Sequence, residues 1–261
     1  MSKTEKELAF LRDLYVETDW TERFTNLLDD NFKFSGEEKI LYVNAGAGSH
    51  ALALREKLDD EIEIFGVSET RELLNIARAK ADLIQANVDF SIVYPTEKFD
   101  AVLADAIFVR PAELKKFLKK IVGSSKKQVA LFLPTASSFG DVFSFLWETL
   151  LNLDWLEKGA EIERLMLDIP TISKVEETAK TLGLTKIQTE TRNEFFEFDN
   201  GKAFINSPLA ADFLFPAWLD FLNESEKERA VNKLARLIDA DCQEMSFRFS
   251  VKATLLVGEK K

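Results

Sequence analysis

Two glycines in the stretch LYVNAGAGSH, residues 41–50, have the spacing of a ligand-binding turn. Gly46 and Gly48 follow an apolar run that is typical of a buried strand, and a helix is predicted from about Ser49 to Leu58. Backbone N–H groups are free at the start of a helix, and glycine has no Cβ to keep a ligand away from them. The sequence therefore predicts that a ligand lies against this turn.

Two residue types that occur only once restrict the remaining side-chain chemistry. Cys242 is the only cysteine and His50 the only histidine, which excludes an internal disulfide and a zinc site built from several thiols. Because the two residues lie far apart in the sequence, we expect neither a catalytic Cys–His pair nor a histidine-ligated metal. We expect Cys242 to be a buried apolar residue. We expect His50 to pack against or cap the helix that follows the turn.

The charge and hydropathy of the chain restrict its partners. The net charge of −11 repels phosphate backbones and argues against nucleic-acid binding. The lysines within 115–120 recur at helical spacing beside apolar residues, as on the solvated face of an amphipathic helix. The sequence has no run of about 18 apolar residues, and its first residues lack the apolar segment of a signal peptide. We therefore expect a cytoplasmic protein that does not bind membranes.

Strands and helices alternate along the first half of the chain. Near-continuous apolar runs such as AVLA and VALFL are typical of parallel strands that are covered on both faces. Such alternation predicts a parallel sheet between two layers of helices. The expected strands are residues 39–44, 62–67, 88–93, 99–105 and 128–134. The helix expected over 69–86 has an apolar stripe of Leu73, Leu74, Ala77, Ala81 and Ile84.

The second half of the chain adds helices and two further strands. A helix is expected over about 139–156, and another is expected to begin with a capping box formed by Ser173 and Glu176. Ser207 followed by Pro208 predicts a further helix start, and 184–198 and 247–258 have the pattern of strands. We expect a single domain, 1–261, with these parts: an N-terminal helical cap (1–35), a core (38–198), a helical insertion (202–241) and a final strand (245–259).

The order of these segments resembles the class I S-adenosylmethionine-dependent methyltransferase family. The matching segments are VNAGAG, FGVSETRELLNIARAKA, FDAVLADAIF, VALFLPTASSF, GLTKIQTET and FRFSVKATLLVG. The resemblance covers roughly residues 38–198 and the closing strand. It implies a three-layer, Rossmann-like α/β fold whose seven-stranded, mostly parallel sheet has an antiparallel last strand. It also implies S-adenosylmethionine as the cofactor and helical caps over the substrate pocket.

The resemblance further implies a cofactor site at the ends of three strands. The family's first motif, D-x-G-x-G-x-G, aligns with Tyr42, Asn44, Gly46 and Gly48, so its acid and its first glycine are replaced. The family's ribose-binding acid aligns with Ser68, which precedes Glu69. Such a bidentate carboxylate contact is worth about 1.5–3 kcal/mol, which Ser68 and Glu69 would have to supply. The expected cofactor contacts are Asn44, Ala45, Gly46, Ala47, Gly48, Ser68, Glu69 and Asp105.

A methyl acceptor would lie beyond the carboxyl ends of the fourth and fifth strands, where open α/β sheets bind ligands. Methyl transfer from a sulfonium depends on alignment and a dry pocket, and a base is not required when the acceptor is already nucleophilic. Asp105 is the candidate for orienting the acceptor or taking a proton, with a cofactor contact as the alternative. The expected contacts of a small-molecule acceptor are Tyr15, Trp20, Phe108 and Phe139.

Three functions from different classes follow from these patterns. The first is methyl transfer to a small molecule. The second is a catalytically silent, methyltransferase-like binding or regulatory module, which the missing acids at Tyr42 and Ser68 favour. The third is a nicotinamide-dependent oxidoreductase, because GAGSHA also fits a loose dinucleotide pattern. The apolar segment 213–222 could serve as a lid or as the interface of a homodimer.

Overall fold

The computed structural model describes residues 3–242 and 245–261. The chain divides into two compact units, each built from several stretches of sequence. The first unit comprises Met1–Leu133, Ile172–Arg192 and Ala253–Lys261, and the second comprises Pro134–Thr171 and Asn193–Lys252. The expectation of one domain over 1–261 stays a prediction, and the two units are described separately.

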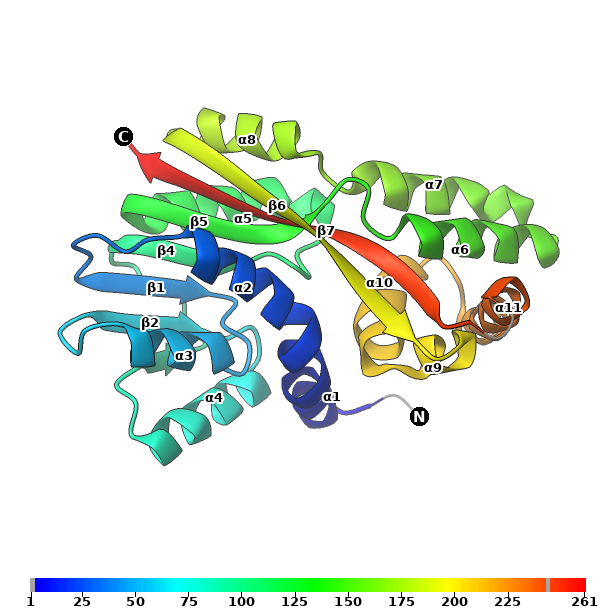
Figure 1. Cartoon of the computed structure of the whole chain (residues 1–261), viewed down its shortest axis with the longest axis horizontal. Coiled ribbons are helices and arrows are strands. Elements are labelled where there is room, and N and C mark those ends of the chain that lie inside the picture. Colours follow the sequence, from blue (N-terminus) through cyan, green and yellow to red (C-terminus); the bar gives the residue numbers. More distant parts are fainter. Residues whose placement is uncertain (1–2, 243–244) are drawn as a thin grey trace. The chain divides into compact units, whose positions relative to one another are not determined.

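The sheet has seven strands in the order β3-β2-β1-β4-β5-β7-β6. The strands are β1 (Lys39–Val43), β2 (Glu63–Val67), β3 (Asp89–Ser91), β4 (Phe99–Asp105), β5 (Ser125–Thr135), β6 (Leu184–Phe198) and β7 (Phe247–Lys260). The pairs β1–β2, β1–β4, β2–β3 and β4–β5 are parallel. Thr185, at the start of β6, donates to the carbonyl of Glu259 near the end of β7, so these two strands run antiparallel (Figure 1). The predicted fold class is confirmed.

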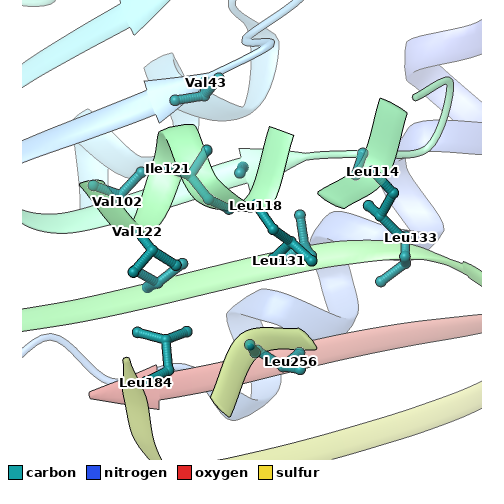
Figure 2. Packing of buried hydrophobic residues seen from close by; sticks show 14 of the residues in the cluster. Val43, Val102, Leu114, Leu118, Ile121, Val122, Leu131, Leu133, Leu184 and Leu256 are labelled. Carbon is teal, nitrogen blue, oxygen red and sulfur yellow. The ribbon is translucent and has the colours of Figure 1, made fainter. Parts of the chain in front are cut away.

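Helices of the first unit cover the sheet. They are α1 (Glu5–Leu11), the π-helical η1 (Arg12–Thr21), α2 (Glu22–Asn31), α3 (Ser49–Lys57), α4 (Arg71–Ile84), α5 (Pro111–Ser124) and α8 (Ile172–Thr181). Apolar residues of α5 pack against β4 and β5, as Figure 2 shows for Leu114, Leu118 and Ile121. The α5 lysines face solvent, as the sequence predicts. Every position of β4 is buried, which explains its unbroken apolar pattern.

The second unit packs helices around a group of aromatic rings. Its helices are α6 (Gly140–Asn152), η2 (Leu156–Lys158), α7 (Gly159–Asp168), α9 (Gly201–Asn206), η3 (Leu209–Leu214), α10 (Phe215–Trp218) and α11 (Glu224–Cys242). Phe204 contacts Phe215 and Phe249, with ring centroids 5.7 and 5.6 Å apart. Trp218 contacts Phe143 at 4.9 Å. The rings of the 213–222 segment that point inward therefore fill the core of this unit.

Three local predictions were wrong. Ser173 lies within the first turn of α8, which begins at Ile172, and Glu176 accepts a hydrogen bond from Thr189 instead of completing a capping box. Ile84 is 49% exposed, because α4 ends there and the chain turns away through a left-handed residue. Cys242 is partly exposed because it is the last residue of α11. The predicted cap at Ser207 is confirmed, since its hydroxyl accepts from the Ala210 N–H.

Candidate cofactor site

The glycine turn joins β1 to α3 at the carboxyl end of the strand (Figure 1). Asn44, Gly46 and Gly48 all have positive φ, of 56°, 57° and 82°. A Cβ on Gly48 would lie 2.7 Å from the Phe90 ring, so this glycine is required by packing against β3. A Cβ on Gly46 would instead collide with the carboxylate of Glu17. Gly46 therefore leaves the open face of the turn free for an oxygen ligand.

The carboxylate of Glu17, from η1, occupies this face of the turn. It accepts from the Ala47 N–H at 2.6 Å and from the Ser49 hydroxyl at 2.7 Å. Burial raises the pKa of Glu17, although these hydrogen bonds and the charge of Arg12 oppose the rise. The turn thus holds a carboxylate oxygen of the protein itself with its backbone N–H, at the place where the sequence predicts a ligand.

Glu69 and Ser68 lie at the end of β2, beside the same turn. Glu69 accepts from the Gly46 N–H at 3.1 Å and from the Arg12 guanidinium at 2.5 Å. Ser68 is 2% exposed, and its hydroxyl has no hydrogen-bond partner among the residues that the structure describes. A buried hydroxyl without a partner costs free energy unless a ligand supplies one.

Arg12 fills the space next to these two residues. Its guanidinium lies 5.3 Å from the centre of the Phe108 ring, and it is 9% exposed. Phe108 in turn stacks on Trp20, with ring centroids 6.5 Å apart. Arg12 and Glu17 thus place a flat cation on an aromatic ring and a carboxylate on the glycine turn.

Asp105 closes the site at the end of β4. It is 4% exposed, and one of its carboxylate oxygens accepts from the Ile107 N–H at 2.7 Å. Asn44 donates to its main-chain carbonyl at 2.8 Å, which ties the turn to β4. Burial raises the pKa of Asp105 to about 7, with Glu69 and Glu17 adding to the rise and Arg12 opposing it. Asp105 can therefore change its charge near neutral pH.

Three hydrogen-bonded side chains lie next to the turn, and sequence reasoning missed the connection between them. The Tyr42 hydroxyl lies 2.9 Å from Nδ1 of His50, and Nε2 of His50 lies 3.0 Å from Asp29. His50 packs edge-on against the Tyr42 ring, with ring centroids 5.5 Å apart, as one of the two expectations has it, and its hydrogen bonds also link β1 to α2. The position of His50 in the first turn of α3 was visible in the sequence, whereas its partner on α2 was not.

A cavity of about 370 Å³ opens beside Tyr42, His50 and Asp29, between η1, α2 and α3 in the first unit. Its walls include residues of the turn and Asp105 as well as the Tyr42–His50–Asp29 chain. The lining residues are Glu17, Thr18, Thr21, Glu22, Thr25, Asn26, Asp29, Tyr42, Asn44, Ala45, Gly46, Ser49, His50, Ala53, Lys57 and Asp105. Its volume is in the range of small-molecule sites.

The structure brings together the expected cofactor residues, Asn44 to Gly48 with Ser68, Glu69 and Asp105. The expected acceptor contacts are more scattered. Trp20 and Phe108 stack on each other, whereas Tyr15 is 58% exposed on η1. Phe139 belongs to the second unit, where it packs against Trp218.

Among the described residues, no group of three or more His, Cys, Asp or Glu side chains could hold a metal ion. No helix in this part of the chain is long and apolar enough to cross a membrane.

Comparisons with known proteins place the fold. No family model and no curated protein matches the sequence. Among solved structures, the YcgJ protein of Bacillus subtilis aligns with 92% of this chain and 99% of its own, at 16% identity and a TM-score of 0.57. Phosphoethanolamine N-methyltransferase 2 of Haemonchus contortus, solved with phosphomonomethylethanolamine and S-adenosylhomocysteine, aligns with 98% of this chain and 57% of its own, at 13% identity and a TM-score of 0.55. Magnesium protoporphyrin IX methyltransferase of Synechocystis, solved with S-adenosylhomocysteine, aligns with 100% and 90%, at 11% identity and a TM-score of 0.50.

The chain has the class I methyltransferase fold. The strand order, the parallel core and the antiparallel β7 all agree with it. In this fold the glycine turn, Ser68 and Asp105 share one edge of the sheet, because β1, β2 and β4 are parallel and their carboxyl ends meet there. Open α/β sheets bind ligands at such an edge, and here Arg12 and Glu17 contact its loops.

Proposed function

We propose that this chain binds S-adenosylmethionine at the glycine turn and uses it to methylate a small-molecule acceptor. The buried hydroxyl of Ser68 is the observation that carries the proposal, because no described residue is its hydrogen-bond partner at the strand end where the resemblance implies the cofactor ribose. The turn at Gly46 also supports the proposal, because the Glu17 carboxylate already lies against it. S-adenosylmethionine, when bound, would supply an electrophilic methyl group.

The chain's own residues would hold this ligand and keep water away. Ser68 would hydrogen-bond a ribose hydroxyl, and Glu69, once freed from Arg12, could accept from the other. The N–H groups of Gly46 and Ala47 would be available to polar atoms of the ligand. Asn44 fixes the turn against β4 and would keep these donors in place.

Arg12 and Glu17 must move before the ligand can enter. Both are 9% exposed and occupy the turn and the neighbouring ring face. They are held by ion pairs and hydrogen bonds that a charged ligand can replace, which makes an exchange feasible. We therefore propose that Arg12 and Glu17 of η1 occupy the cofactor site when no cofactor is bound.

The decisive experiment is calorimetric titration with S-adenosylmethionine and, separately, S-adenosylhomocysteine. We expect Ser68→Ala to weaken binding about 5- to 10-fold, the effect of one lost hydrogen bond. Ser144→Ala, which removes an exposed hydroxyl from α6, is the matched control and should leave the affinity unchanged. Equal affinities of Ser68→Ala and wild type would place the ligand elsewhere.

The catalytically silent module remains the second candidate, and one observation favours it. The chain fills its own glycine turn with Glu17, so the Ala47 N–H and the Ser49 hydroxyl have partners without a ligand. A Glu17→Ala variant distinguishes the two functions. If Glu17→Ala binds S-adenosylmethionine more tightly than the wild type does, Glu17 competes with the cofactor for the turn. No heat at millimolar ligand, in both the variant and the wild type, would leave only the silent module.

A further inference from the structure

The cavity beside the turn is lined by more negative than positive side chains. Its walls contain the carboxylates of Glu17, Glu22, Asp29 and Asp105, against Lys57 and the imidazole of His50. Lys57 and Asp29 are paired at 2.6 Å and compensate each other, so the excess of acidic side chains comes from Glu17, Glu22 and Asp105. An anion would be repelled by these walls, whereas an organic cation would be attracted.

The hydrogen bonds among Tyr42, His50 and Asp29 fix which way the Tyr42 hydroxyl points. Burial raises the pKa of Asp29, but hydrogen bonds from His50 and Lys57 outweigh this and leave it below its usual value, so Asp29 is ionised and can only accept. Nε2 of His50 must then carry a hydrogen and donate to Asp29. In neutral His50 the other nitrogen, Nδ1, accepts from the Tyr42 hydroxyl. The lone pairs of the Tyr42 oxygen are therefore left for the cavity.

Two further oxygens in the cavity wall lack partners. One carboxylate oxygen of Asp105 accepts from Ile107, and within the described residues no donor reaches the other. The hydroxyl oxygen of Thr21 is buried and also has no partner in that part of the chain. Asp105 as a residue is 4% exposed and lines the cavity. The cavity therefore offers the free carboxylate oxygen of Asp105 as an acceptor, and the Thr21 hydroxyl as a group that can accept or donate.

We propose that the cavity binds a small organic ammonium ion, with the Tyr42 oxygen and the Asp105 carboxylate accepting its N–H groups. Protonated amines combine a positive charge with several N–H donors, which matches both the charge and the acceptors of the walls. The described residues form no cluster suited to a metal ion, which points to an organic cation. An amine held here would be the methyl acceptor once the ammonium had passed one proton to the Asp105 carboxylate, which leaves a nitrogen lone pair to attack the methyl group; in that respect the inference rests on the proposed function. Amine binding itself needs no cofactor.

Three probes of similar size and different charge test the proposal by calorimetry. Ethanolamine is cationic, ethylene glycol neutral and glycolate anionic. We expect ethanolamine to bind at least tenfold more tightly than the other two. We expect Tyr42→Phe to weaken ethanolamine binding about tenfold, because one charge-assisted hydrogen bond is lost. Tyr94→Phe, which changes a tyrosine outside the cavity, is the matched control and should bind as wild type does.

A spectroscopic measurement on the unmodified protein keeps the test independent of how the variants fold. Because His50 is the only histidine, its imidazole nitrogens give unambiguous signals. Ethanolamine should shift the Nδ1 signal, since a donor to the Tyr42 oxygen polarises the O–H bond toward His50. Glycolate should not shift it. Equal binding of glycolate, ethanolamine binding without a His50 shift, or no binding near 10 mM would each overturn the proposal. Ethanolamine binding without S-adenosylmethionine binding would overturn the proposed function alone.

Discussion

Three side chains at the site serve two purposes each. Glu17 satisfies the donors of the glycine turn and also lines the cavity. Arg12 neutralises Glu69 and also covers the Phe108 ring. Asp105 ends β4 and presents a buried carboxylate to the cavity. Because they share neighbours, a change at one of them should alter the charge balance of the others.

Asp105 gives a prediction for stability against pH. Its pKa of about 7 in the folded protein lies above the ordinary value of 3.8, so the folded state binds the proton more tightly than the unfolded state does. Stability from this group is therefore lost as pH rises toward and past 7. We expect the free energy of unfolding of the wild type to fall between pH 5 and pH 8. In Asp105→Asn this fall should be smaller by about 2–3 kcal/mol.

Denaturant unfolding at both pH values measures this effect. Asp82→Asn, at an exposed position of α4, provides the control. The rise in the pKa of Glu17 acts in the same direction, but Glu17 is present in both proteins and cancels from the comparison. An identical pH dependence of wild type and Asp105→Asn would show that burial does not raise the pKa of Asp105.

Sequence reasoning found the residues whose positions are fixed by strand ends. Asn44, Ser68 and Asp105 follow directly from where β1, β2 and β4 stop, since parallel strands end at a common edge. Arg12 and Asp29 could not be found in this way. Their contacts depend on how η1 and α2 dock on the turn, and no local pattern encodes docking between segments 57 and 21 residues apart.

At the scale of elements, η1 is the unusual part of the structure. It is a ten-residue π-helical stretch between two α-helices, a conformation that is rare and concentrated at functional sites. The sequence predicts a helical cap over 1–35, and its pattern does not distinguish a π-helix from an α-helix. The wider π-helical turn places Arg12, Val16, Glu17 and Trp20 among its buried residues.

Hydrogen–deuterium exchange tests whether η1 leaves the site when the cofactor binds. We expect S-adenosylhomocysteine to increase exchange over residues 12–21 and to decrease it over 44–52. The first change follows from release of Glu17 and Arg12, and the second from new contacts at the turn. Greater protection of both segments would mean that η1 instead closes over the ligand. Exchange in α11, in the second unit, serves as the internal reference.

At the scale of the whole molecule, the net charge of −11 adds a long-range attraction for cations. If the cavity takes an ammonium ion, the affinity for ethanolamine should fall several-fold as ionic strength rises from about 0.02 to 0.2 M, because the Debye length shortens to below 10 Å. Ethylene glycol binding should not respond. Ethanolamine affinity that is independent of salt would indicate a fully desolvated contact without help from the molecular field.

The position of β7 within the sheet has a consequence for biosynthesis. β7 lies between β5 and β6, although both of these strands precede it in the chain. A nascent chain therefore carries β6 without its neighbour until the residues after Phe247 have left the ribosome. The native sheet can be completed only after β7 has been synthesised, and until then the apolar edge of β5 is open to chaperones or to pairing with other chains.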